Sequence, residues 1–234
     1  MADMLDGVMA AFRLIVGLDP DLLAIVFLSL RVTVTALAIA CLIGMPLGAW
    51  LALSRFPFRR TVIAVLNALM GLPPVVVGLV VYLLLSRAGP FGVLGLLYTP
   101  TAMVIAQVII VTPIVASIAH QTVRELWSGY RDLLVSLGAT RVQRIATLLI
   151  DGRRGLVTAA LTGFGRAIGE VGAVMIVGGN IDNVTRVLTT AIALETAKGD
   201  FALAIGLGII LVGLALGVSL AVHWASGTER GRFA

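Results

Sequence analysis

The chain has 234 residues, of which 59% are hydrophobic and only 12% charged, and its mean hydropathy is +1.08. A water-soluble fold of this length could not bury so much apolar surface, so the composition excludes an ordinary soluble domain. The net charge of +5 lies in short stretches between apolar segments, which is typical of membrane topology and excludes nucleic acid as a partner.

Five apolar segments are long enough to cross a bilayer, because a helix needs about 20 residues to do so. They lie at about 32–53, 62–85, 101–119, 156–177 and 201–224. Residues 22–30 either extend the first span into the outer interface or form a separate surface helix, and residues 4–18 could form a short amphipathic helix. The sequence therefore predicts an all-α integral membrane protein with one transmembrane domain over residues 1–234.

Arginine and lysine lie unequally in the connections between these segments. One side has Arg55, Arg59, Arg60, Arg124, Arg131, Arg141, Arg144, Arg153, Arg154, Arg230 and Arg232, and the other has only Arg13, Arg87, Arg186 and Lys198. Positively charged connections stay in the cytoplasm. We therefore expect a cytoplasmic connection at about 120–154, a cytoplasmic C-terminus and an outside N-terminus.

Prolines interrupt three of the predicted spans. Pro46 and Pro113 stand alone, which is typical of a packing kink. Pro73 and Pro74 remove two adjacent amide donors from the second span, so this helix should be kinked or unwound there. For this pair, a packing kink and a pathway-lining helix with an unwound centre both remain open.

Small residues recur four apart in three of the spans, a spacing that lets helix backbones approach closely. This pattern predicts packing within one subunit for most of them, although an interface between two copies remains open. The pairs are Gly44 and Gly48, Gly165 and Gly169, and Gly213 and Gly217.

The connection 120–154 has two amphipathic stretches separated by Gly138. Apolar residues of the first stretch follow one helical face, and Gly138 offers a flexible or positive-φ turn. A hairpin lying on the lipid surface would have the same pattern. The apolar positions are Val123, Leu126, Trp127, Tyr130, Leu134 and Leu137, followed by Val142, Ile145, Ala146 and Leu149.

Arg166 and Glu170 are four residues apart in the fourth predicted span and can form an ion pair. A charge at this depth is costly and needs a reason. The pair could fix helix packing or form a hydrated gate element. Because a bare carboxylate repels an anion, we do not expect Glu170 to be a direct anion ligand.

The sequence has no phosphate-binding loop of the G-x-x-x-x-G-K-[ST] type. Cys41, His120 and His223 do not have the spacing of a metal site. We therefore expect a transport subunit rather than an enzyme, with no cofactor and no metal, whose energy comes from another polypeptide.

The segment around Gly138 resembles the cytoplasmic loop of type I ABC importer permeases. The family pattern is Glu-Ala-Ala, three residues, Gly, nine residues, then Ile-x-Leu-Pro. Here Asp132 stands at the glutamate, but leucines replace both alanines and Asp151 stands at the proline. In the family this loop forms a coupling helix in a groove of the ATPase, which implies a coupling role for Asp132, Leu133, Leu134, Gly138, Ala139 and Arg141.

The resemblance covers most of the chain. Residues 165–181 (GRAIGEVGAVMIVGGNI) are similar to the oxyanion branch of these permeases, and residues 185–211 look most like tungstate permeases. The resemblance implies a bacterial or archaeal cell-membrane permease for tungstate, with molybdate next and sulfate third. It also implies a homodimer that encloses the pathway. From their residue types and positions, we expect Pro73, Pro74, Arg166 and Glu170 to be pathway or gate residues.

The implied partners are a second copy, a cytoplasmic ATPase dimer, membrane lipid and an extracytoplasmic oxyanion-binding protein that meets loops 86–100 and 178–200. A stand-alone secondary transporter or channel is the main alternative, and a membrane anchor for another complex is a third. A secondary transporter predicts internal repeats and several intramembrane charges. The sequence shows no such repeats and only one or two such charges.

Overall fold

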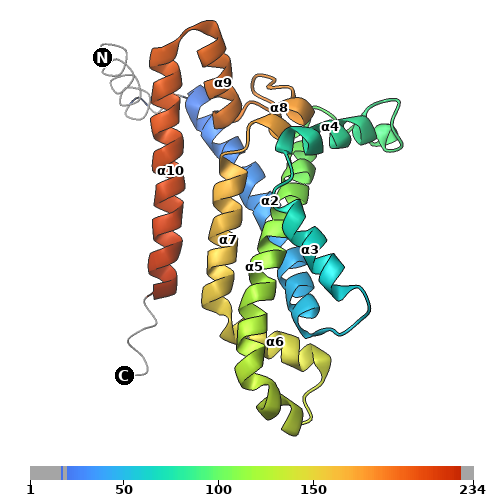
Figure 1. Cartoon of the computed structure of the whole chain (residues 1–234). Coiled ribbons are helices and arrows are strands. Elements are labelled where there is room, and N and C mark those ends of the chain that lie inside the picture. The colour runs from blue at the N-terminus through green and yellow to red at the C-terminus, as the bar shows by residue number, and fades with distance from the viewer. Residues whose placement is uncertain (1–16, 18–19, 228–234) are drawn as a thin grey trace.

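The computed structural model describes residue 17 and residues 20–227, and that part of the chain is helical without strands (Figure 1). The predicted amphipathic helix at 4–18 therefore falls almost wholly outside the described residues. The helices are α2 (Pro20–Leu53), α3 (Arg59–Leu69), α4 (Pro74–Leu85), the 3-10 helix η1 (Gly92–Leu94), α5 (Pro100–Ser136), α6 (Arg141–Asp151), α7 (Arg153–Ile168), α8 (Gly172–Gly178), α9 (Leu188–Lys198) and α10 (Phe201–Gly227).

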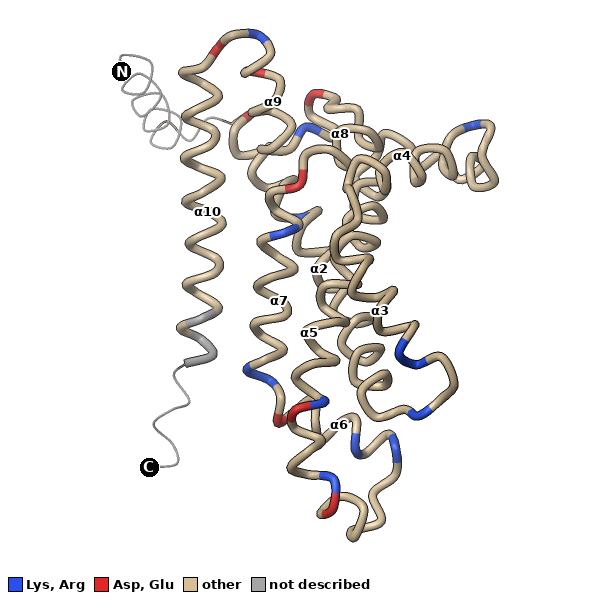
Figure 2. Tube along the Cα trace, viewed as in Figure 1, with Lys and Arg blue, Asp and Glu red and all other residues tan. Residues whose placement is uncertain are grey.

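Three of these helices, α2, α5 and α10, are long and apolar enough to cross a membrane, and there are five such spans if each of two bent helix pairs counts as one. The prediction of an all-α membrane protein is confirmed. Because α2 begins at Pro20, residues 22–30 extend the first span and do not form a separate helix. Charged residues gather toward the two ends of the molecule, with arginine dense at the end that contains α6 (Figure 2). We call this the α6 end and the opposite one the α9 end.

Helices α2 and α5 form the central pair of the fold. A Cβ atom at Gly48 would overlap the carbonyl oxygen of Ala116 and lie 2.8 Å from the amide nitrogen of His120. The backbones therefore touch at Gly44 and Gly48, and internal packing is confirmed for this pair. In contrast, Gly213 and Gly217 on α10 have no atom near a hypothetical Cβ.

Two spans are broken. Helices α3 and α4 meet at 98°, and Pro73 and Pro74 are the N-cap and first residue of α4, where proline is well tolerated. Helices α7 and α8 meet at 58°. The prediction of one continuous helix over 156–177 is therefore wrong, because α7 ends at Ile168 and α8 begins only at Gly172.

The connection 178–200 contains the helix α9, which at 11 residues is too short to be recognised as a membrane span from the sequence. Helix α9 packs against α10 after a sharp turn at Gly199, whose φ is +83°. Leu188 and Ala191 of α9 share a buried cluster with Leu22 and Leu207. The α9 end is therefore a packed cap and not an open loop.

Candidate functional site

The first candidate site is the helical hairpin at the α6 end, formed by the last turns of α5 and by α6. Gly138 joins them with φ +66°, which confirms the predicted positive-φ turn. The amide of Ala139 donates to the carbonyl of Leu134 (3.1 Å), and that of Gly138 donates to Val135 (3.0 Å). These two bonds form a Schellman motif, which ends α5 in a defined direction.

Helix α6 begins with a capping box that fixes its first turn. The Thr140 hydroxyl accepts a hydrogen bond from the Gln143 amide (3.4 Å), and the Gln143 side chain accepts one from the Thr140 amide (2.8 Å). The two bonds satisfy amides that the helix itself cannot pair. The turn and the cap together fix the direction in which α6 leaves the end of α5.

The hairpin is anchored to the ends of α2 and α5 by a small apolar core. This cluster includes Ala49 and Ala52 of α2, Val123 and Leu134 of α5, and Leu148 of α6. Leu134, predicted as a coupling residue, is only 7% exposed and therefore acts from inside the hairpin. A displacement of α6 would also displace the ends of α2 and α5, because the side chains between them are close-packed.

Several large apolar residues of the hairpin face outward. Leu133 is 55% exposed, Leu137 71%, Val142 76% and Ile150 67%. Tyr130 and Leu137 share the predicted helical face with the buried Leu134, but both are exposed. Asp132 and Arg141 are exposed as well, whereas Ala139 is half-buried. Exposed apolar residues among charges are typical of a protein interface.

The second candidate site lies where the two broken spans meet. A Cβ atom at Gly172 would lie 2.8 Å from Cγ2 of Val75, and one at Gly78 would lie 2.7 Å from Cα of Ala173. The first turns of α4 and α8 are therefore in backbone-close contact. Discontinuous helices that meet inside a membrane are typical of transport pathways.

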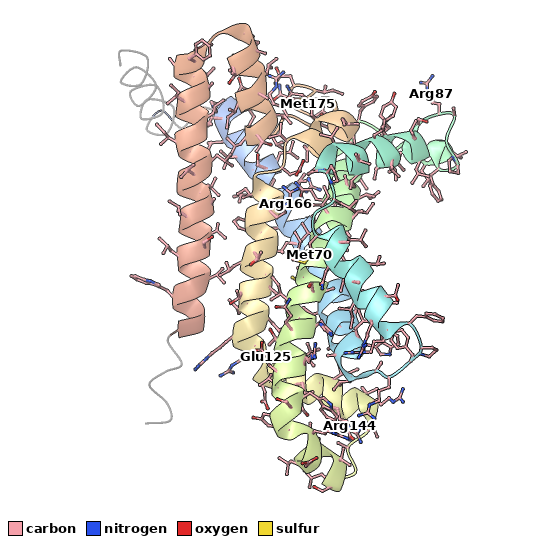
Figure 3. All side chains as sticks on the ribbon, in the orientation of Figure 1. Met70, Arg87, Glu125, Arg144, Arg166 and Met175 are labelled. Atoms are coloured by element: carbon pink, nitrogen blue, oxygen red, sulfur yellow. The ribbon has the colours of Figure 1, made fainter. Side chains whose placement is uncertain are left out.

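Glu170 lies in the break between α7 and α8. Its Oε2 atom is 3.3 Å from Nη1 of Arg166, and its Oε1 atom accepts a hydrogen bond from the Ala173 amide (3.1 Å). Its carbonyl accepts one from the Thr189 hydroxyl (2.9 Å). Glu170 is 4% exposed, whereas Arg166, near the upper end of α7 in Figure 3, is 35% exposed. The carboxylate thus joins α7 to α8, and the backbone carbonyl of the same residue joins this break to α9.

A group of buried polar residues, which the sequence reasoning missed, surrounds this carboxylate. Gln107 donates to the carbonyl of Ala167 (3.1 Å), and Ser29 accepts from the amide of Leu188 (2.9 Å). Ser29, Gln107 and Glu170 line one small hollow of about 10 Å³. The sequence signal that could have identified this group is Gln107, a polar residue in an otherwise apolar part of the third predicted span.

Comparisons with known proteins agree on one family. Residues 44–226 match the family described as "Binding-protein-dependent transport system inner membrane component". The chain is 42% identical to the tungstate uptake system permease protein TupB of Peptoclostridium acidaminophilum, over 93% of this chain and 96% of that protein. It is 33% identical to TupB of Campylobacter jejuni, over 93% of this chain and 91% of that protein. It is 28% identical to the molybdenum transport system permease protein ModB of Azotobacter vinelandii, over 73% of this chain and 79% of that protein.

The family match covers well over half of the chain, and the helices match its multi-pass architecture. Permeases of this type are transport subunits that work with an ATPase and a substrate-binding protein. The chain belongs to the family of binding-protein-dependent transport system inner membrane components, the membrane permeases of ABC importers.

Proposed function

We propose that this permease carries tungstate into the cell, with molybdate as the next candidate and sulfate as the third. The observation that supports this order is the 42% identity to a tungstate permease along almost the whole chain, against 28% for the molybdenum permease. We assign the choice of anion to the extracytoplasmic binding protein, which delivers it to the α9 end. The buried Glu170 carboxylate would repel a bare oxyanion and is therefore not its ligand.

The working unit proposed here is a homodimer of this single-domain chain on a cytoplasmic ATPase dimer. The described residues of one chain offer at most five spans, and α4 is a 12-residue helix that turns away from α3 and cannot cross a bilayer alone. Its side chains Val75, Val76, Leu79, Val80 and Leu83 are each about half exposed. A second copy that covers this apolar face would enclose a pathway between the two chains.

We propose that the α6 end is cytoplasmic and the N-terminus outside, in a bacterial or archaeal cell membrane. The support is the charge distribution, since most arginines lie at the α6 end (Figure 2). The coupling surface then comprises Asp132, Leu133 and Arg141 together with the exposed residues of the hairpin, and it faces the ATPase. Leu134, Gly138 and Ala139 hold its shape.

The proposed gate comprises Pro73, Pro74, Arg166 and Glu170, and α7 connects it to the coupling hairpin. Only Gly152 separates α6 from α7, whose 16 residues span about 24 Å up to the Glu170 break. Closure of the ATPase dimer would displace α6, and α7 would transmit this displacement to the gate. Because the breaks of α7–α8 and α3–α4 are packed together, they would move together.

An uptake experiment tests the proposed substrate. The permease, its ATPase and its binding protein are expressed in a host that lacks its own tungstate and molybdate importers, and cell-associated tungsten is measured. We expect tungstate uptake that excess molybdate reduces and excess sulfate barely affects. Uptake of sulfate in preference to tungstate would contradict the anion assignment. Uptake without the binding protein would contradict its role.

A further inference from the structure

A groove rich in arginine lies at the α6 end, between the end of α2, the last turns of α5 and the start of α6. It has a volume of about 240 Å³ and contains no acidic side chain. We call it the arginine groove, and its main lining residues are Leu53, Arg55, Trp127, Arg131, Arg141 and Arg144. Arg141 lies at the border between this groove and the proposed coupling surface. Four like charges around one hollow repel each other unless an anion lies between them.

The charges of the arginine groove are not balanced by acidic side chains of the described residues. None of its four arginines forms an ion pair with a described residue. The Nε atom of Arg144 is buried and has no hydrogen-bond partner among the described residues. Its guanidinium carbon lies 5.8 Å from the centroid of the Trp127 ring, which orients the group. Figure 3 labels Arg144 on α6, at the α6 end of the molecule. A buried unpaired donor and planar guanidinium groups suit a phosphate group.

A second hollow beside the groove adds an aromatic boundary. It shares Arg55 with the groove, has a volume of about 390 Å³ and is also lined by Phe56, Phe58, Arg59 and Arg60. Phe58 is 79% exposed, and its φ is +64°. Phenylalanine side chains beside basic residues are typical of surfaces that lie at the level of lipid headgroups. This combination favours a lipid phosphate over a free phosphate ion.

An exposed apolar stripe leads from this boundary toward the centre of the membrane. The ring of Phe56 stacks on Trp50 with centroids 5.4 Å apart. Ile43, Leu47 and Trp50 lie on one face of α2 and are 49%, 37% and 44% exposed. Such a stripe would cover the acyl chain of a lipid whose headgroup lies in the groove.

We infer that the arginine groove binds the phosphate group of an anionic phospholipid from the cytoplasmic leaflet. The bound lipid would tie the end of α2 to the coupling hairpin, since Arg55 follows α2 and Arg144 belongs to α6. This inference goes beyond the proposed function and holds whichever oxyanion is carried.

Native mass spectrometry of the purified permease–ATPase complex tests it, after exchange into mixed phosphatidylglycerol and phosphatidylcholine. We expect the complex to retain phosphatidylglycerol selectively. In the double variant Arg55→Gln/Arg144→Gln, the affinity for phosphatidylglycerol should fall about 25-fold, because each arginine near an anionic surface raises the affinity about fivefold. Arg55→Lys/Arg144→Lys should keep most of the binding. The matched control, Arg124→Gln/Arg154→Gln, removes two exposed charges at the same end but outside the groove and should behave as wild type.

The other occupants give different results. Equal phosphatidylglycerol retention in both glutamine double variants would overturn the inference. Displacement of the lipid by millimolar inorganic phosphate would show that the groove is a free-anion site. Unchanged lipid retention with loss of the ATPase from Arg55→Gln/Arg144→Gln would show a protein contact instead. Thermal unfolding of each complex separates these outcomes from misfolding.

Discussion

Replacing Glu170 by glutamine is expected to impair transport severely or to release ATP hydrolysis from control. The amide keeps the size of the carboxylate and can still accept from the Ala173 amide, but it leaves Arg166 without its counter-charge. Breaking a buried pair costs about 3–5 kcal/mol, and water at the partly exposed Arg166 lowers that figure. Uptake and ATPase activity of the reconstituted complex, measured together, report the change.

Two further variants show whether the effect belongs to the gate. Glu125→Gln makes the same chemical change at an exposed carboxylate on α5, away from the gate and from the α9 end, and it should leave transport near wild type. Arg166→Gln/Glu170→Gln removes both charges and should recover part of the loss. The preference for tungstate over molybdate should not change in any variant with the same binding protein. A reversed anion preference in Glu170→Gln would mean that this residue helps to determine substrate specificity, which would contradict the gating account.

Gly138→Leu is expected to abolish most ATP-driven uptake and to weaken association with the ATPase, while membrane insertion stays normal. The φ of +66° costs a residue with a β-carbon about 1–2 kcal/mol. A Cβ atom at this position would meet no other atom, so the strain comes from the backbone alone. The turn would open, and the exposed face of α6 would be displaced. Co-purification of the ATPase and uptake in proteoliposomes measure the two effects.

The controls for this prediction lie in the same segment. Gly138→Asn should retain most activity, because asparagine tolerates the left-handed conformation. Gly129→Leu is the same substitution in the helical part of α5, where a Cβ atom also has free space, and it should be tolerated. Wild-type uptake with an intact complex in Gly138→Leu would rule out the coupling assignment. A hairpin that merely lies on the lipid surface should tolerate all three changes.

The features that the sequence predicts correctly are those with a local chemical cause. Gly138 between two amphipathic stretches indicated the turn, and the Schellman bonds around it confirm the turn. Pro73 and Pro74 cannot donate backbone hydrogen bonds, so the break between α3 and α4 followed from residue type. The apolar lengths indicated the spans because the thickness of the bilayer sets them.

The features that sequence reasoning missed depend on contacts between distant segments. No proline marks the break between α7 and α8, where Glu170 pairs with the Ala173 amide and Gly172 packs against Val75. Leu134 and Leu137 share the periodicity of one helical face. However, α5 ends at Ser136 and α6 folds back over Leu134, which leaves Leu137 outside. Neither arrangement can be read from periodicity alone.

The most direct measurement of the central claim is tungstate uptake into proteoliposomes that contain the permease and its ATPase. Binding protein loaded with tungstate is added outside, and ATP is enclosed inside. We expect tungstate to accumulate only when ATP, the ATPase and the binding protein are all present, and an ion gradient to have no effect. Accumulation by the permease alone, driven by an ion gradient without ATP, would contradict an ATP-driven importer and would support a stand-alone secondary transporter.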